Sequence, residues 1–117
     1  GYFFPSFEAV RHRIVLDTTP DYLYQETALR AVAEMPSTPQ VLFLLRKPSR
    51  RIYSLFRFAQ NNVGVLDHGM SFADFVARVR AGGFPAERVI LRRAIEHSDY
   101  ATYISRWIDA IGRDVRI

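Results

Sequence analysis

One stretch of the sequence indicates the fold most clearly: Val41-Leu42-Phe43-Leu44-Leu45-Arg46-Lys47-Pro48-Ser49-Arg50-Arg51-Ile52-Tyr53-Ser54-Leu55-Phe56. Its first five residues are apolar, which is typical of a parallel strand buried between helices on both faces. Pro48 is a residue favoured at the first helical position, so a helix is expected from Pro48 to about Asn62. Apolar residues recur along this helix at i, i+3, i+4 and i+7 and are expected to form its buried stripe: Ile52, Leu55, Phe56 and Ala59. A strand that leads directly into a helix predicts an α/β fold.

The residues before this stretch predict another strand and a crossover helix. Ile14-Val15-Leu16 is a short apolar run, and the turn cluster Asp17-Thr18-Thr19-Pro20 follows it. Helix formers dominate from about Tyr24 to Met35, and Pro36-Ser37-Thr38-Pro39 stops that helix. The order strand, helix, strand, helix indicates a right-handed βαβ unit with parallel strands. Because ligands bind beyond the carboxyl ends of such strands, the turn cluster and Arg46-Lys47 are expected along one edge.

After a loop, the chain predicts three more helices and the start of a strand. Ser71 caps the first of these helices, and Gly82-Gly83 ends it. The other two are expected at about Ala86 to Ile95 and Asp99 to Ile111. Asp114-Val115-Arg116-Ile117 is typical of the beginning of a strand. One apolar face of the last helix consists of Tyr100, Ile104, Trp107, Ile108 and Ile111.

The start of the helix at Pro48 carries an unusual concentration of positive charge. The basic residues there are Arg46, Lys47, Arg50 and Arg51, and no Asp or Glu lies between Thr38 and Gln60. The helix dipole disfavours each exposed cation at this end by about 0.3–1 kcal/mol, so the arrangement favours the arrival of an anion. Free backbone N–H groups and Arg side chains together suit phosphate or sulfate. The alternative is a solvated basic helix face.

A hydroxyl group lies in position to join such a site. Arg51, Ser54 and Phe58 share a helical face at i, i+3 and i+7, turned away from the buried stripe. The Ser54 hydroxyl is therefore expected to point toward the end of the strand, where Arg46 emerges. An arginine and a hydroxyl that converge in this way can bind one phosphate group.

The composition narrows the class of protein. The 117 residues suffice for one small domain, and the hydrophobic content of 49% predicts a packed core. No apolar run is long enough for a membrane helix, and the absence of cysteine excludes disulfides, thiolate catalysis and Cys-ligated metal. Of the 16 basic residues, 15 are Arg. This bias suits the binding of phosphate and sulfate or, alternatively, reflects a GC-rich coding sequence. The net charge of +4 favours anionic partners. We expect a bacterial source and, from that, a cytoplasmic location.

Other polar residues carry less chemical information. His12, His68 and His97 lie far apart in the sequence without metal-ligand spacing, so no metal site is predicted. Asp17 follows the first predicted strand, so we expect it to contact a hydroxyl group of a bound molecule or, as the simpler alternative, to form a turn or cap a helix.

Three motifs resemble segments of the sulfotransferases that use 3′-phosphoadenosine 5′-phosphosulfate (PAPS). Their 3′-phosphate-binding motif is commonly L-R-x-P-x-x-R-x-x-S-x-Y. It is similar to Leu45-Arg46-x-Pro48-x-x-Arg51-x-x-Ser54-x-Phe56 in this chain. Asp17-Thr18-Thr19-Pro20-Asp21-Tyr22-Leu23 is similar to the E-K-[ST]-P-x-Y-[FL] segment of heparan-sulfate-type and bacterial carbohydrate members. Tyr100-x-x-x-Ile104-x-x-Trp107 resembles their Y-x-x-x-L-x-x-W helix. The matches follow the family order and together cover most of the chain.

The resemblance implies a fold and a function. Arg46 and Ser54 would bind the 3′-phosphate of PAPS, with Arg51 in support, near the phosphate or as a structural ion-pair partner. The stripe from Tyr100 to Trp107 would belong to the core. The implied fold has three layers, P-loop-like, with a parallel sheet flanked by helices. Residues 1–117 would be the central part of a single sulfotransferase domain, incomplete here. The loop for the 5′-phosphosulfate would precede Gly1, and the C-terminal part would follow Ile117.

The implied reaction transfers a sulfuryl group from PAPS to a hydroxyl or amine of a carbohydrate or small molecule and releases PAP. The general base would also lie outside the chain, so the catalytic residues stay unassigned and the fragment alone is expected to be inactive. Two departures bear on the acceptor: Thr18 replaces the family's Lys, and Phe58 occupies a position where some members have His. The alternatives are a basic module that binds nucleic acid and a degenerate sulfotransferase fold kept for protein interaction. Nucleic acid is not the expected partner, because no recognised nucleic-acid motif is present.

Overall fold

The computed structural model describes residues 14, 16–37, 39–112 and 115–117, and within them the protein is mostly helical with a two-stranded parallel sheet. The elements in chain order are η1 (Tyr22–Tyr24), α1 (Glu26–Ala33), β1 (Val41–Leu42), α2 (Pro48–Asn61), α3 (Phe72–Arg80), α4 (Val89–Arg92), η2 (Glu96–Ser98), α5 (Tyr100–Ile111) and β2 (Val115–Arg116). In this coarse sense the predicted α/β class is compatible with the structure.

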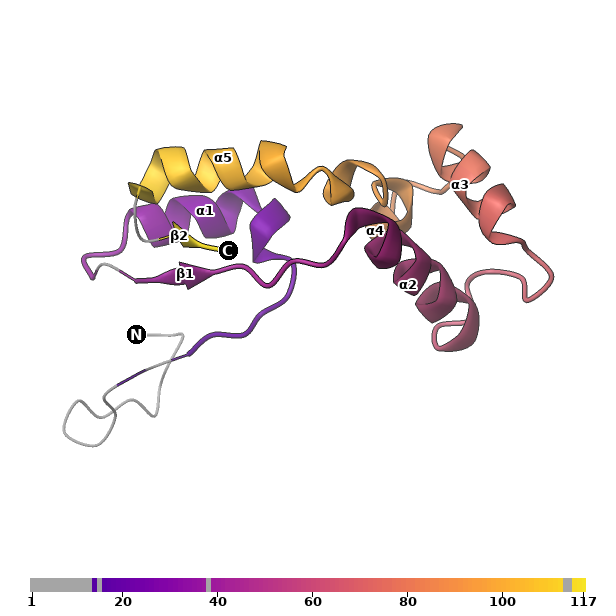
Figure 1. Ribbon diagram of the computed structural model, residues 1–117, viewed down its shortest axis with the longest axis horizontal. Coiled ribbons are helices and arrows are strands. Elements are labelled where there is room, and N and C mark those ends of the chain that lie inside the picture. Colours follow the sequence, from indigo (N-terminus) through magenta and orange to yellow (C-terminus); the bar gives the residue numbers. More distant parts are fainter. Residues whose placement is uncertain (1–13, 15, 38, 113–114) are drawn as a thin grey trace.

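The sheet pairs a strand from the middle of the chain with one from its end. Val41 pairs with Val115 and Leu42 with Arg116, and the Phe43 N–H donates to the Arg116 carbonyl at 2.9 Å. The predicted strand at the end of the chain is therefore confirmed at Val115 and Arg116. Figure 1 shows α1 and α5 along one side of this strand pair.

The predicted burial of both strand faces is wrong for two residues. Phe43 is buried, whereas Leu42 and Leu44 are 64% and 88% exposed. Successive side chains of an extended chain point to opposite sides, and in the described part of the chain only the side of α1 and α5 is covered. The strand is also shorter than predicted, because its described partner β2 is two residues long.

Two further predictions are corrected. Ile14 and Leu16 belong to no strand and are 85% and 77% exposed, so they do not form the first strand of the expected βαβ unit. The helix expected from Ala86 to Ile95 is reduced to the single turn of α4, followed by η2. Leu91 and Ala94 are the buried residues of this segment, so little apolar surface is available to support a longer helix.

The start and end signals of α2 and α3 act as predicted. Pro48 occupies the first turn of α2, and the stripe of Ile52, Leu55, Phe56 and Ala59 faces the core. Ser71 caps α3, because its hydroxyl oxygen accepts from the Asp74 backbone N–H at 3.1 Å. Gly82 follows α3 with a φ of +65°, a conformation that glycine adopts without strain.

The buried side chains form two separate hydrophobic clusters. Cluster A joins α2, α3 and α4 and consists of Phe56, Ala59, Leu66, Phe75, Val79, Phe84, Leu91 and Ala94. Cluster B joins η1, α1, β1 and α5 and consists of Leu23, Leu29, Phe43, Tyr103, Ile104 and Trp107. In Figure 1 the helices of cluster A lie beyond those of cluster B along the long axis, in a molecule of 55 × 30 × 24 Å. The fold thus consists of two packed groups of elements.

The predicted face of α5 is confirmed for its central residues. Trp107 is 1% exposed, its indole N–H donates to the Leu23 carbonyl at 3.2 Å, and Phe43 packs edge-on against it. Ile104 is buried as well. Ile108 is 46% exposed, whereas Tyr103 is buried, so the apolar face is rotated toward η1.

Candidate functional site

The basic start of α2 has no negative partner of its own. Lys47 is the N-cap residue, and its side chain makes no capping hydrogen bond. The first turn contains no acidic residue. The backbone N–H groups there lack side-chain acceptors and lie at the positive end of the helix dipole, a combination that suits an anion.

The structure brings Arg46 and Ser54 together. An Arg46 guanidinium N–H (Nη1) donates to the Ser54 hydroxyl oxygen at 3.3 Å, and both residues are exposed. Arg46 lies between β1 and α2, and Ser54 lies in the second turn of α2. The connection from β1 thus positions the guanidinium, and the helix positions the hydroxyl. The predicted convergence of an arginine and a hydroxyl is confirmed. The serine proton and the other guanidinium N–H groups can donate to an incoming oxygen atom.

Arg51 points to another part of the molecule. Its Nη1 donates to the Ala94 carbonyl and to the Ser98 hydroxyl oxygen, both at 3.2 Å. Its guanidinium also lies over the Tyr24 ring, 5.4 Å from the centroid. Of the two roles predicted for Arg51, this geometry favours the structural one, through hydrogen bonds and a cation–π contact. The expectation that Arg51 shares the exposed face of Ser54 and Phe58 is therefore wrong.

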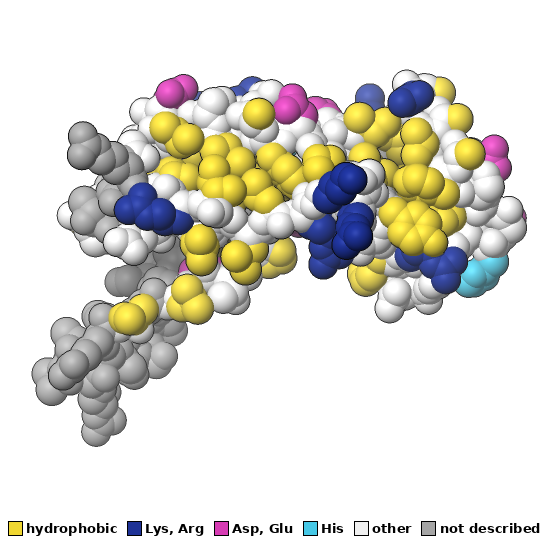
Figure 2. Space-filling model, in the orientation of Figure 1, with side chains coloured by type: hydrophobic (Ala, Val, Ile, Leu, Met, Phe, Trp, Pro, Cys, Tyr) yellow, Lys and Arg dark blue, Asp and Glu magenta, His cyan; other side chains and the backbone are white. Residues whose placement is uncertain are grey.

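More positive charge surrounds the Arg46–Ser54 pair. Lys47 and Arg50 are exposed, and the sequence has no Asp or Glu between Glu34 and Asp67. Figure 2 shows Lys and Arg side chains gathered over the region where the chain from β1 enters α2. This local positive field attracts anions more strongly than the net charge of +4 alone implies.

Asp17 forms a turn, as the simpler interpretation predicted. Its Oδ1 accepts from the Thr19 backbone N–H at 2.9 Å and from the Thr19 hydroxyl at 2.6 Å. Its Oδ2 accepts from the Tyr22 hydroxyl at 2.8 Å. The hydrogen bonds from Thr19, followed by that from Tyr22, lower the pKa of the Asp17 carboxyl. Both carboxylate oxygens are therefore engaged within the turn.

The two histidines in the described part of the chain lie in different segments. His12 lies outside the described residues, and His68 is exposed in the loop after α2. His97 is buried in η2 against Tyr24 and Tyr103. No local sequence pattern indicates this environment, because these neighbours come from η1 and α5. Within the described ranges no group of three or more His, Cys, Asp or Glu side chains could hold a metal ion.

A depression elsewhere on the molecule lies between α1 and α5. It has a volume of about 520 Å³, is open to solvent and is lined by Glu26, Leu29, Arg106, Asp109 and Ala110. The two carboxylates in its lining oppose anion binding, so its charge does not match that of the α2 start. We therefore regard the Arg46–Ser54 pair as the candidate site on chemical grounds.

No model of a known protein family matches the chain, nor does any curated protein or any solved structure. The function of the site is accordingly argued from its own residues. None of the helices in the described part of the chain is long and apolar enough to span a membrane.

Proposed function

We propose that the protein is a PAPS-dependent sulfotransferase and that Arg46 and Ser54 bind the 3′-phosphate of the nucleotide. The single observation that supports this most is the hydrogen bond between their side chains, because the residues belong to one sequence motif and meet eight positions apart. The absence of acidic residues from the first turn of α2 supports it as well.

The chemistry of the pair fits a phosphate dianion. Arg46 supplies charged N–H donors, Ser54 supplies an O–H donor, and the first turn of α2 adds the positive end of its dipole. In the proposed reaction the acceptor oxygen or nitrogen attacks the sulfur atom in line, the bond from sulfur to the 5′-phosphate oxygen breaks, and PAP leaves. By analogy with phosphoryl transfer, positioning and charge stabilisation carry such a step. Arg46 and Ser54 anchor the nucleotide away from the reacting sulfur, and no catalytic residue is assigned.

Several finer statements belong to the same proposal. The two-stranded sheet would be part of a three-layer, P-loop-like sheet with helices on both faces. The acceptor would be a hydroxyl or amine of a carbohydrate or small molecule. The Arg-rich, Cys-free composition supports a bacterial source and, through it, a cytoplasmic location.

The test is calorimetric titration of the protein with PAP. Arg46→Ala should weaken PAP binding about tenfold or more, the scale of one charge-assisted contact. Arg80→Ala is the matched control, because it removes the same charge from an exposed position on α3. ADP lacks the 3′-phosphate, so its weaker binding should not depend on Arg46. Equal PAP affinities of the Arg46→Ala variant and the unsubstituted protein would exclude this site.

A basic module that binds nucleic acid is the second candidate. Arg50 and Arg57 are exposed and lie two turns apart on α2, which supports it. Nucleic-acid binding would appear as strongly salt-dependent affinity for a generic oligonucleotide. Such affinity without any response to PAP would favour this candidate over the sulfotransferase. A degenerate sulfotransferase fold would respond to neither ligand.

A further inference from the structure

His97 lies where the two hydrophobic clusters meet. The residue is 6% exposed, and its ring stacks on Tyr24, which packs against cluster B, with the centroids 4.2 Å apart and the planes at 8°. The edge of Tyr103 meets the same imidazole at 5.8 Å and 83°. η1, η2 and α5 thus share one aromatic layer around His97.

Arg51 connects this layer to the other cluster. It belongs to α2, whose buried stripe lies in cluster A. Its hydrogen bonds end on Ala94, which precedes η2, and on Ser98, the last residue of η2, and its guanidinium lies over Tyr24. The Ser98 hydroxyl also donates to the Ala94 carbonyl at 2.8 Å. Arg51 and His97 therefore both contact Tyr24, which packs against cluster B.

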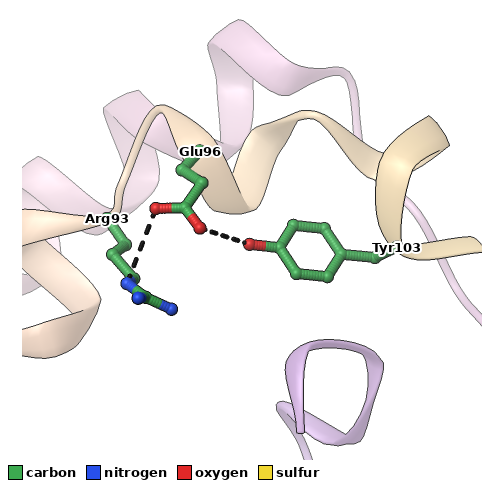
Figure 3. A network of polar contacts seen from close by, with 3 residues as sticks. All are labelled: Arg93, Glu96 and Tyr103. Carbon is green, nitrogen blue, oxygen red and sulfur yellow. Dashed lines mark hydrogen bonds and ion pairs between the residues drawn. The ribbon is translucent and has the colours of Figure 1, made fainter. Parts of the chain in front are cut away.

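Four charged side chains from the surrounding segments act on His97. Arg51 faces it from α2, Asp21 from the residue before η1, and Arg93 and Glu96 from its own segment. Tyr24 and Tyr103 are neutral neighbours whose pKa burial raises. The Glu96 carboxylate, the nearest negative group, accepts from the Tyr103 hydroxyl at 2.9 Å and pairs with the Arg93 Nε at 3.5 Å, as Figure 3 shows.

We propose that the layer of Tyr24, Arg51, His97 and Tyr103 is a pH-sensitive joint between the two clusters. At neutral pH an uncharged imidazole stacks in the layer beside the permanent charge of Arg51. Protonation places a second cation in the same poorly hydrated layer, where the two charges repel each other. The contacts that tie α2 to η1 and η2 then weaken, and the clusters come apart locally while each keeps its own core.

The direction of the pH effect follows from the environment. Burial, followed by the charge of Arg51, lowers the pKa of His97 from its usual 6.5, and Glu96 opposes this shift. The folded protein therefore binds the His97 proton less readily than the unfolded chain does. The contribution of the joint is present in full above pH 6.5 and is lost as the pH falls through the folded pKa. This proposal does not depend on the proposed function, because no nucleotide takes part in it.

The test compares amide hydrogen exchange of the protein and of His97→Phe at pH 7 and pH 5. Phenylalanine preserves a flat ring for the stack but cannot take up a proton. After correction for intrinsic exchange rates, the hydrogen-bonded amides of Ala94, His97 and Ser98 should exchange more than about twofold faster at the lower pH, because acid opens the joint locally. In the variant the same ratio should stay within about twofold. The amides in the middle of α5 should stay protected in both proteins.

Two controls make the outcome decisive. His68→Phe removes an exposed histidine and should leave the acid response intact. His97→Gln provides a second non-titrating variant if phenylalanine does not fit the layer. Chemical-shift titration of the His97 ring protons should give a pKa below 6.5. A His97 pKa at or above 6.5 would overturn the proposal. So would an acid response in both His97 variants that equals the response of the unsubstituted protein.

Discussion

Gln60 shows how a single polar side chain can determine the course of a loop. It is 3% exposed although it lies in the last turn of α2, and its amide nitrogen donates to three backbone carbonyls. These belong to Asp67, His68 and Met70, at 2.9, 3.0 and 3.2 Å. The loop after α2 thus wraps around one amide group, which adds donors to the hydrogen bond that the loop makes itself, from the Met70 N–H to the Asp67 carbonyl at 3.0 Å.

Gln60→Ala should therefore lower the free energy of unfolding by about 1–3 kcal/mol, because it leaves carbonyl groups without their donor. Gln40→Ala is the control, since Gln40 is exposed, and it should stay within about 0.5 kcal/mol. Urea unfolding followed by circular dichroism measures both variants. Equal stability of the two would mean that the loop finds other donors at no cost.

At the scale of elements, β1 and the residues after it have one protected side. Phe43 packs against Trp107 with the ring centroids 5.3 Å apart, while Leu44 is exposed on the opposite side. A run of five apolar residues contains no alternation that would reveal this difference. The positions of α1 and α5 decide which side is covered.

The neighbouring substitutions Phe43→Ala and Leu44→Ala should therefore have unequal effects. The first should lower the free energy of unfolding by about 3 kcal/mol or more, through lost burial and the cavity left against Trp107. The second should change it by no more than about 0.5 kcal/mol, because the side chain already faces solvent. Chemical denaturation of the two variants provides the comparison. A similar large loss for Leu44→Ala would show that this side is covered in solution.

At the scale of the whole molecule, two clusters of modest size depend on few connections. Arg51 provides one of them, because its hydrogen bonds and its cation–π contact reach from α2 to η1 and to the segment from Ala94 to Ser98. Arg46, five residues earlier, is exposed and contacts Ser54 within its own segment. The two arginines of one motif thus have different positions: Arg46 belongs to the candidate site, and Arg51 connects two parts of the fold.

Arg51→Ala should consequently lower the unfolding free energy by about 1–3 kcal/mol, whereas Arg46→Ala should change it by about 0.5 kcal/mol or less. Arg51→Lys should recover little of the loss, because an ammonium group lacks the planar fork and stacks less well on Tyr24. Thermal unfolding of the three variants at one protein concentration distinguishes these effects. Full stability of Arg51→Ala would show that the clusters are joined by other contacts.

The local features of the fold could be predicted from the sequence. The proline and stripe of α2, the serine cap of α3, the terminal glycine and the core role of Trp107 were all predictable, because each depends on residues close together in the chain. The meeting of Arg46 and Ser54 was predictable for the same reason, since Arg46 lies just before α2 and Ser54 only eight positions further on. Which side of β1 is covered, whether Ile14 and Leu16 join a strand, and where Arg51 and His97 point depend on the packing of the whole molecule. These features depend on contacts between segments far apart in sequence, such as Arg51 with Ser98 and Trp107 with Leu23, which no local pattern records.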